Sequence, residues 1–128
     1  MEYGYTKKLN IPFDEAIKRV TEELAQEGFG ILTEINVKDT LKKKLDVDFD
    51  NYVILGACNP PFAYKVLQSE HEIGLLLPCN VVVYEKQEEV FASSILPTVA
   101  MNIVENSELQ TIAMDVEEKL KTVINNLI

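Results

Sequence analysis

The sequence has few of the residues that most often carry chemistry or nucleic-acid binding. It contains no tryptophan, one histidine and only two cysteines. Twelve Lys and Arg side chains stand against 21 Asp and Glu side chains, which gives a net charge of −9. Because affinity for nucleic acid comes largely from neutralised phosphates, this excess of negative charge argues against a nucleic-acid partner. The lack of tryptophan also leaves few aromatic platforms on which single-stranded bases would stack.

Long hydrophobic runs are missing as well. The longest, from residue 73 to 84, is about half a membrane span and is interrupted by Pro78 and Asn80. The N-terminal stretch MEYGYTKKLNIPFDE lacks the apolar segment that a secretory signal needs. We therefore predict a cytoplasmic protein without a membrane partner. In that compartment two cysteines are more often free thiols than a structural disulfide.

Several motifs that identify enzymes or metal proteins are absent. The sequence has no Gly-rich phosphate loop, no Gly-x-Ser-x-Gly and no His-Glu-x-x-His. A set of Cys58, Cys79, His71 and Glu34 contains zinc-ligating residue types, but the long spacing between the cysteines is no zinc signature. The sequence therefore predicts no metal site, identifies no cofactor, and leaves open whether the protein is an enzyme.

The 128 residues suit one domain with a single core, and no linker or repeat divides residues 1–128. Alternating or continuous apolar residues predict five strands, and an apolar residue at every third or fourth position predicts the helices between them. The strands are expected over residues 2–9, 29–35, 52–58, 77–84 and 90–94. This order predicts an α+β domain with a mainly antiparallel sheet of about five strands and helices packed on one face.

Local signals define the expected helix ends. Pro12 suits the first turn of a helix that begins near residue 13, and Gly28 suits the position that closes it. Asn36 resembles the cap of a short helix that ends in three lysines. The polar link over residues 85–88 predicts a hairpin, although it lacks the glycine that tight turns favour.

The C-terminal third is expected to be helical after Pro97. A first segment is predicted over residues 98–104, and Ser107 with Gln110 matches the capping box of a longer helix. Apolar residues recur along one face of that helix up to Leu127. We expect this face to cover the sheet.

Residues 29–35 are predicted to form a strand with one buried face. Phe29, Ile31 and Ile35 alternate with residues such as Leu32 and Glu34. Glu34 either points to solvent or faces a pocket, where it would act as a base or a ligand.

Cys58 lies at the end of a predicted buried strand and just before a predicted helix over residues 60–69. Pro60 holds Asn59 in the extended conformation of a helix cap, and Pro61 follows in the first turn. The positive end of the helix would lower the pKa of the Cys58 thiol, whereas burial would raise it. Cys58 is therefore either a small core residue or a reactive or ligating thiol.

Cys79 begins the next predicted strand, after Pro78. If the strands that contain Cys58 and Cys79 are antiparallel neighbours, both cysteines lie at the same edge of the sheet. Asn59 and Asn80, which follow the two cysteines, are then candidates for ligand binding. His71 lies in a polar stretch and is expected at the surface.

The segments GFGILTEINVKDTLKKKL, DFDNYVILGACNPPFAYKVL and EIGLLLPCNVVVYE, in this order, closely resemble the domain of unknown function 302 family. The resemblance covers nearly the whole chain. It implies a fold similar to that of the TATA-binding protein, with a curved antiparallel sheet backed by helices, often in a homodimer. Related chains keep Asn59-Pro60 and Leu77-Pro78 without the cysteines, and they tend to carry Asp where this chain has Leu96.

Two functional hypotheses follow. The first is a noncatalytic binding module, a homodimer that holds a small apolar ligand at the sheet edge or under the long helix. The second is a thiol-dependent activity, redox or metal-linked, centred on Cys58 with Cys79 as its partner. In the second hypothesis Glu34, Asn59 and Asn80 would orient or polarise the bound group.

Overall fold

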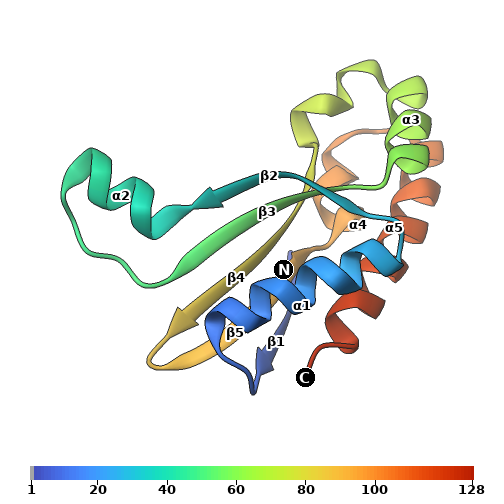
Figure 1. Cartoon of the computed structure of the whole chain (residues 1–128). Helices are drawn as coiled ribbons and strands as arrows, with labels where there is room; N and C mark the ends of the chain where they lie inside the picture. Colours follow the sequence, from blue (N-terminus) through green and yellow to red (C-terminus); the bar gives the residue numbers. More distant parts are fainter. Residues whose placement is uncertain (1) are drawn as a thin grey trace.

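The computed structural model describes residues 2–128 and forms a single α+β domain (Figure 1). Its strands are β1 (Gly4–Leu9), β2 (Gly30–Asn36), β3 (Tyr52–Cys58), β4 (Cys79–Lys86) and β5 (Glu89–Ile95). Its helices are α1 (Phe13–Gln26), α2 (Val37–Leu45), α3 (Pro60–Ser69), α4 (Pro97–Ala100) and α5 (Ser107–Asn125). Two 3₁₀ helices are η1 (His71–Leu76) and η2 (Met101–Ile103). Within residues 2–128, no helix has both the length and the apolar composition to cross a membrane.

The five strands form one sheet in the order β1-β5-β4-β3-β2, and every neighbouring pair is antiparallel. The predicted hairpin between β4 and β5 is confirmed. Its two turn residues, Gln87 and Glu88, have φ of 52° and 67°. Two consecutive positive φ values are typical of the turn whose twist matches antiparallel strands, so this hairpin forms without glycine.

The main core lies between one face of the sheet and helices α1 and α5. Leu24 from α1 and Leu120 and Ile124 from α5 are almost fully buried, as are Leu55 of β3 and Val83 of β4. Leu24 and Leu120 fall on the apolar faces that the periodicity predicted, whereas Ile124 is a buried residue outside the predicted face. The prediction that α5 covers the sheet is therefore confirmed.

Strand β2 differs from its prediction, because no residue of the strand itself is buried. A bulge between Ile31 and Thr33 shifts the register against β3 and breaks the expected alternation. The strand is at the sheet edge, and helix α2, which follows it, also buries no residue. Residues 34–51, here called the arm, extend away from the rest of the domain (Figure 1).

The cap of α2 is confirmed, but the cap of α5 is not the predicted one. Asn36 accepts a hydrogen bond from the backbone N–H of Asp39 at 3.0 Å. At α5 the cap is Asn106, whose Oδ1 accepts from the N–H groups of Glu108 and Leu109 at 3.1 and 3.2 Å. The predicted capping box fails because the Gln110 side chain donates to the carbonyl of Thr98 at 3.2 Å instead.

The segment after Pro97 is less regular than predicted. Helix α4 ends at Ala100, and η2 continues it only to Ile103. Leu96, at the cap position of α4, supplies no side-chain hydrogen bond. Instead, Glu117 of α5 accepts a hydrogen bond from the backbone N–H of Thr98 at 3.1 Å, so the start of α4 is paired from another helix.

Replacing Asn106→Ala should destabilise the protein by about 1–2 kcal/mol, because α5 loses its cap. The Asn106 amide also donates to the Ser69 carbonyl at 3.3 Å, and this contact is lost as well. Ser107→Ala, one residue later, should change the free energy of unfolding by less than about 0.5 kcal/mol. Chemical denaturation of both variants measures the difference. Equal losses would contradict the cap assigned to Asn106.

Candidate functional site

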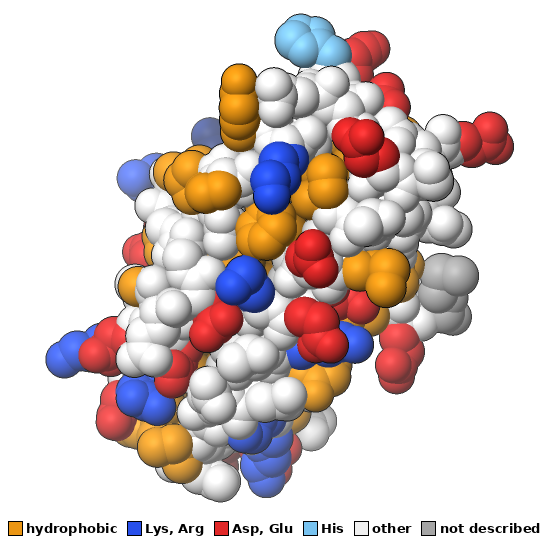
Figure 2. All heavy atoms as spheres, turned by 90° about the vertical axis from the view of Figure 1, so that its right-hand side faces the viewer, with side chains coloured by type: hydrophobic (Ala, Val, Ile, Leu, Met, Phe, Trp, Pro, Cys, Tyr) orange, Lys and Arg blue, Asp and Glu red, His pale blue; other side chains and the backbone are white. Residues whose placement is uncertain are grey.

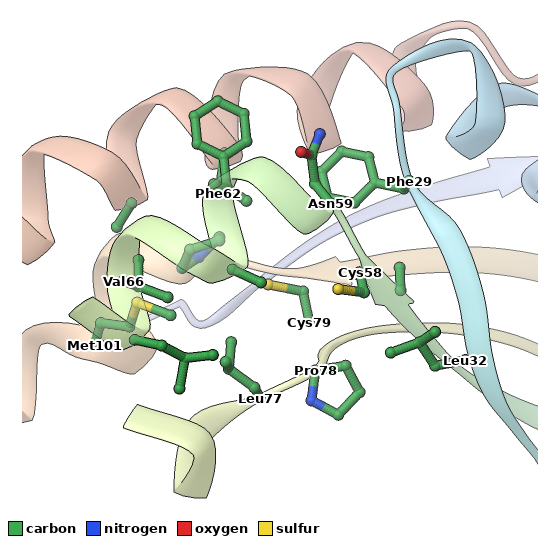
Figure 3. Close-up of a pocket in the computed structure, with 16 residues that line it drawn as sticks. Phe29, Leu32, Cys58, Asn59, Phe62, Val66, Leu77, Pro78, Cys79 and Met101 are labelled. Atoms are coloured by element: carbon green, nitrogen blue, oxygen red, sulfur yellow. The ribbon is translucent and has the colours of Figure 1, made fainter. Parts of the chain in front are cut away.

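A cavity of about 290 Å³ lies where β2, β3 and β4 meet α3, the segment from Pro97 to Met101, and α5 (Figure 3). Of its lining side chains, only Asn59 is neither apolar nor a cysteine. The lining residues are Phe29, Leu32, Ala57, Cys58, Asn59, Phe62, Ala63, Val66, Leu67, Leu77, Pro78, Cys79, Pro97, Met101, Ala113 and Val116.

A second, smaller core cluster holds the helices around this cavity. Val66 of α3, Ile73 of η1, Met101 of η2, and Leu109 and Ala113 of α5 pack together and are buried. The cluster holds α3 against η1, η2 and α5. Alanines at 57, 63 and 113 line the space that remains.

The cavity is open to solvent on one side. Leu32 of β2 and Leu67 of α3 line it, yet they are 68% and 37% exposed. Figure 2 shows the face on the α3 and α5 side, where hydrophobic side chains gather in the upper half of the view, among acidic and basic ones. A ligand would therefore enter past side chains that are themselves apolar.

The two cysteines lie at the same end of the sheet, as the sequence predicted. Ala57 pairs with Cys79 in the β3–β4 ladder, which places Cys58 one residue beyond that pair. Both thiols are free and half-buried. In Figure 3 the two side chains lie near each other in the middle of the cavity lining.

Gly56 makes this arrangement possible. A Cβ atom at this position would collide with Oγ1 of Thr33 on β2 and with Cγ of Pro78 at the start of β4. Only a residue without a side chain lets Pro78 rest on β3 here. The contact positions Pro78, and Cys79 after it, at the cavity wall.

Asn59 occupies the cap position of α3, but its side chain does not cap that helix. Instead its Nδ2 donates a hydrogen bond to the carbonyl of Glu27 at 3.2 Å. Gly28, with φ of 86°, ends α1 directly beside this amide. The predicted extended conformation of Asn59 at the cap position is confirmed, but its side chain makes no capping hydrogen bond, because the nearby end of α1 offers an acceptor. Asn59 joins the end of α1 to the start of α3.

Burial raises the pKa of the Cys79 thiol to about 11, and the nearby Cys58 adds a smaller effect in the same direction. A buried thiolate loses hydration that the apolar wall does not replace. Cys79 therefore keeps its proton at neutral pH. This environment makes Cys79 a poor nucleophile, since the thiolate is the reacting species.

The other candidate residues do not lie in the cavity. Glu34 is exposed on the arm, beside a shallow hollow that Asn36 and Lys43 also line. Asn80 is exposed and pairs with Gly56, and it does not line the cavity. His71 is exposed, as predicted. Among residues 2–128, no group of three or more His, Cys, Asp or Glu side chains is arranged to hold a metal ion.

Sequence reasoning missed most of the apolar cavity wall. Phe62, Val66 and Met101 line it from α3 and η2. Their positions fit ordinary core-facing helices, and nothing in the spacing separates a cavity wall from a filled core. The nearest signal is the set of alanines at 57, 63 and 113, small residues in otherwise bulky apolar segments.

Alkylation by iodoacetamide tests the pKa of Cys79 in a Cys58→Ser variant, in which it is the only thiol. The rate should keep rising with pH above 9, because burial, the larger cause of the raised pKa of Cys79, remains in this variant. When the same variant is unfolded in urea, its alkylation rate should level off near pH 9.0, the ordinary pKa of a cysteine thiol. A folded-state rate that levels off by pH 9 would contradict the buried, protonated thiol.

Comparisons with known proteins agree with this architecture. Residues 5–127 match the family described as "Domain of unknown function DUF302". The chain is similar to the crystal structure of an uncharacterized conserved DUF302 protein from Bacillus stearothermophilus, with 33% identity and a TM-score of 0.92. That similarity covers 98% of each chain. A search of curated proteins finds no match.

Proposed function

The chain belongs to the DUF302 family, whose description assigns no activity, and we propose from the cavity that it is a noncatalytic module binding a small apolar ligand. The observation that carries this proposal is the nearly uniform apolar lining of an open cavity. Apolar pockets with few polar groups are the usual form of small-molecule sites.

The cavity restricts the chemistry of its ligand. Its volume of about 290 Å³ is near the lower end of the roughly 300–1,000 Å³ typical of ligand pockets. None of the lining residues is Lys, Arg, Asp or Glu, so a charged ligand group inside would lose its hydration without gaining a partner. The side-chain Oδ1 of Asn59, which does not cap α3, can accept one hydrogen bond. The ligand is therefore neutral, with one polar group at most.

A thermal-shift experiment with octanol tests this function. Octanol should raise the Tm, because its chain leaves water for the cavity. Octanediol, which has the same chain and a second hydroxyl, should raise it less. The second hydroxyl would lie against apolar side chains without a hydrogen-bond partner.

A pair of variants of α3 shows where octanol binds. Ala63→Leu adds bulk inside the cavity and should abolish the shift. Gln68→Leu adds an apolar residue on the exposed side of the same helix and should leave the shift unchanged. The proposal is wrong if octanol gives no shift, or if Ala63→Leu responds as the wild type does.

Thiol-dependent chemistry is the second candidate function. It is supported by one observation, the presence of both Cys58 and Cys79 in the lining of the same cavity. The raised pKa of Cys79 opposes a role for it as an attacking or resolving thiol at neutral pH. A metal-linked role is not weakened in the same way, because a bound metal ion displaces the thiol proton.

We also propose that the protein forms a homodimer through the arm. Ile35, Leu45 and Val47 on the arm are between 43% and 66% exposed, and α2 buries no side chain. Edge strand β2 offers unpaired backbone groups next to them, a combination that favours association. Lys42 and Asp46 form an ion pair at 3.0 Å, so the arm carries charges of both signs. Side chains of opposite charge on two identical arms can therefore face each other.

The oligomeric state of two charge variants tests this interface. Leu45→Glu should convert a dimer to a monomer, because it places a carboxylate in the apolar contact. Met114→Glu, on α5, changes a side chain of similar exposure (60% against 66%) and should remain dimeric. Sedimentation velocity distinguishes the two states. A monomeric wild type, or dissociation by both variants alike, would refute an interface at the arm.

A further inference from the structure

The cavity contains an unusual share of the protein's sulfur. The sequence has two cysteines and three methionines, and both cysteines and Met101 line this one space. Thiols and thioethers are soft, polarisable ligands, and soft ligands select soft metal ions such as Cu(I). Three such groups around one cavity suggest a binding role beyond the filling of space.

Both thiols line the same cavity. Antiparallel pairing of β3 with β4 fixes Cys79 opposite Ala57, and Cys58 is the next residue. In Figure 3 the sulfur atoms of Cys58 and Cys79 face the same part of the cavity, and Met101 lies on the wall beyond Cys79.

The rest of the lining decides which kind of ion fits. No carboxylate, imidazole or amine lines the cavity, so hard cations such as Ca²⁺ and Mg²⁺ lack the oxygen ligands that they need. Structural Zn²⁺ takes four ligands, and no His, Asp or Glu accompanies the cysteines in the lining. A monovalent soft ion that accepts two thiolates needs neither oxygen ligands nor a set of four ligands.

We propose that Cys58 and Cys79 bind one Cu(I) ion as a pair of thiolates inside the apolar cavity. Met101 contributes a soft, polarisable wall on the far side. The positive ion gains the two thiolates as partners, and the resulting complex carries a net charge of −1. The inference rests on the second candidate function and is independent of octanol binding.

The binding step needs no electron transfer. Two S–H bonds break, two Cu–S bonds form, and two protons leave to solvent, while copper stays Cu(I). Because protons compete with the ion, affinity should rise with pH through the neutral range.

A competition titration under anaerobic, reducing conditions tests the proposal. Reduced full-length protein is added to Cu(I) held by the coloured chelator bicinchoninate. We expect one Cu(I) per chain to move to the protein, with a thiolate-to-copper band in the ultraviolet and more transfer at higher pH. Zn²⁺ offered in the same way should stay with its chelator. Retention of all Cu(I) by bicinchoninate would overturn the proposal.

Variants locate the ion. Cys58→Ser and Cys79→Ser should each weaken binding by more than the roughly 100-fold that loss of an outer partner costs a metal site. Met114→Leu, which removes a 60% exposed thioether on α5, should bind as the wild type does. Unchanged Cu(I) affinity in either serine variant would show that other groups bind the ion.

A measurement on the wild type tests the site without any substitution that could disturb folding. Bound Cu(I) should protect both thiols from iodoacetamide, read by mass spectrometry of the peptides that contain Cys58 and Cys79. Alkylation of either thiol at its copper-free rate would exclude the site. If the serine variants still show the octanol-induced rise in Tm without copper, their cavity is intact. A loss of Cu(I) binding can then be distinguished from a loss of apolar-ligand binding.

Discussion

The pairing of β3 with β4 is the interaction on which the cavity depends. It brings Gly56 under Pro78, and the missing side chain of Gly56 is what lets the start of β4 rest on β3. From that contact follow the position of Cys79 beside Cys58 and the place where the chain turns into α3. A larger residue at 56 would push Pro78 and Thr33 away and change the wall that both cysteines share.

The two core clusters explain why a cavity remains at this end of the sheet. The main cluster holds α1 and α5 on the sheet, whereas the second holds α3, η1 and η2 against α5. Asn59 joins the two regions through its hydrogen bond to the end of α1. Since α3 is supported at its side and its start, the space between α3 and the sheet need not be filled by side chains. The same apolar surroundings that would accept a neutral ligand also keep Cys79 protonated.

In the arm, unlike in the rest of the chain, apolar residues at helical spacing are not fully buried. In the body of the domain apolar periodicity corresponds to burial, but in α2 the stripe is only partly covered: Val37 and Leu41 are half-buried and Leu45 is exposed. A short amphipathic helix gains most of its stability from packing, so an incompletely covered stripe is costly unless another surface covers it. This contrast within one chain is the reason for proposing that the arm contacts a second copy.

The sequence by itself determined the class of fold and most of its elements. Periodicity and turn residues were enough for the five strands and the long C-terminal helix, and the shared edge of Cys58 and Cys79 followed from the order of the strands. Those signals are local, because each depends on residues within one element.

Tertiary structure alone decided which surfaces are buried and which polar partners are chosen. The exposure of β2 depends on a bulge and on its place at the sheet edge. Asn106 rather than Ser107 caps α5, and Asn59 bonds to Glu27 rather than to its own helix. The Asn59 side chain bonds to an acceptor 32 residues away and the Asn106 amide to one 37 residues away, and no local pattern contains such partners. The cavity belongs to the same class, because an empty volume is a property of how several elements pack and of no single segment.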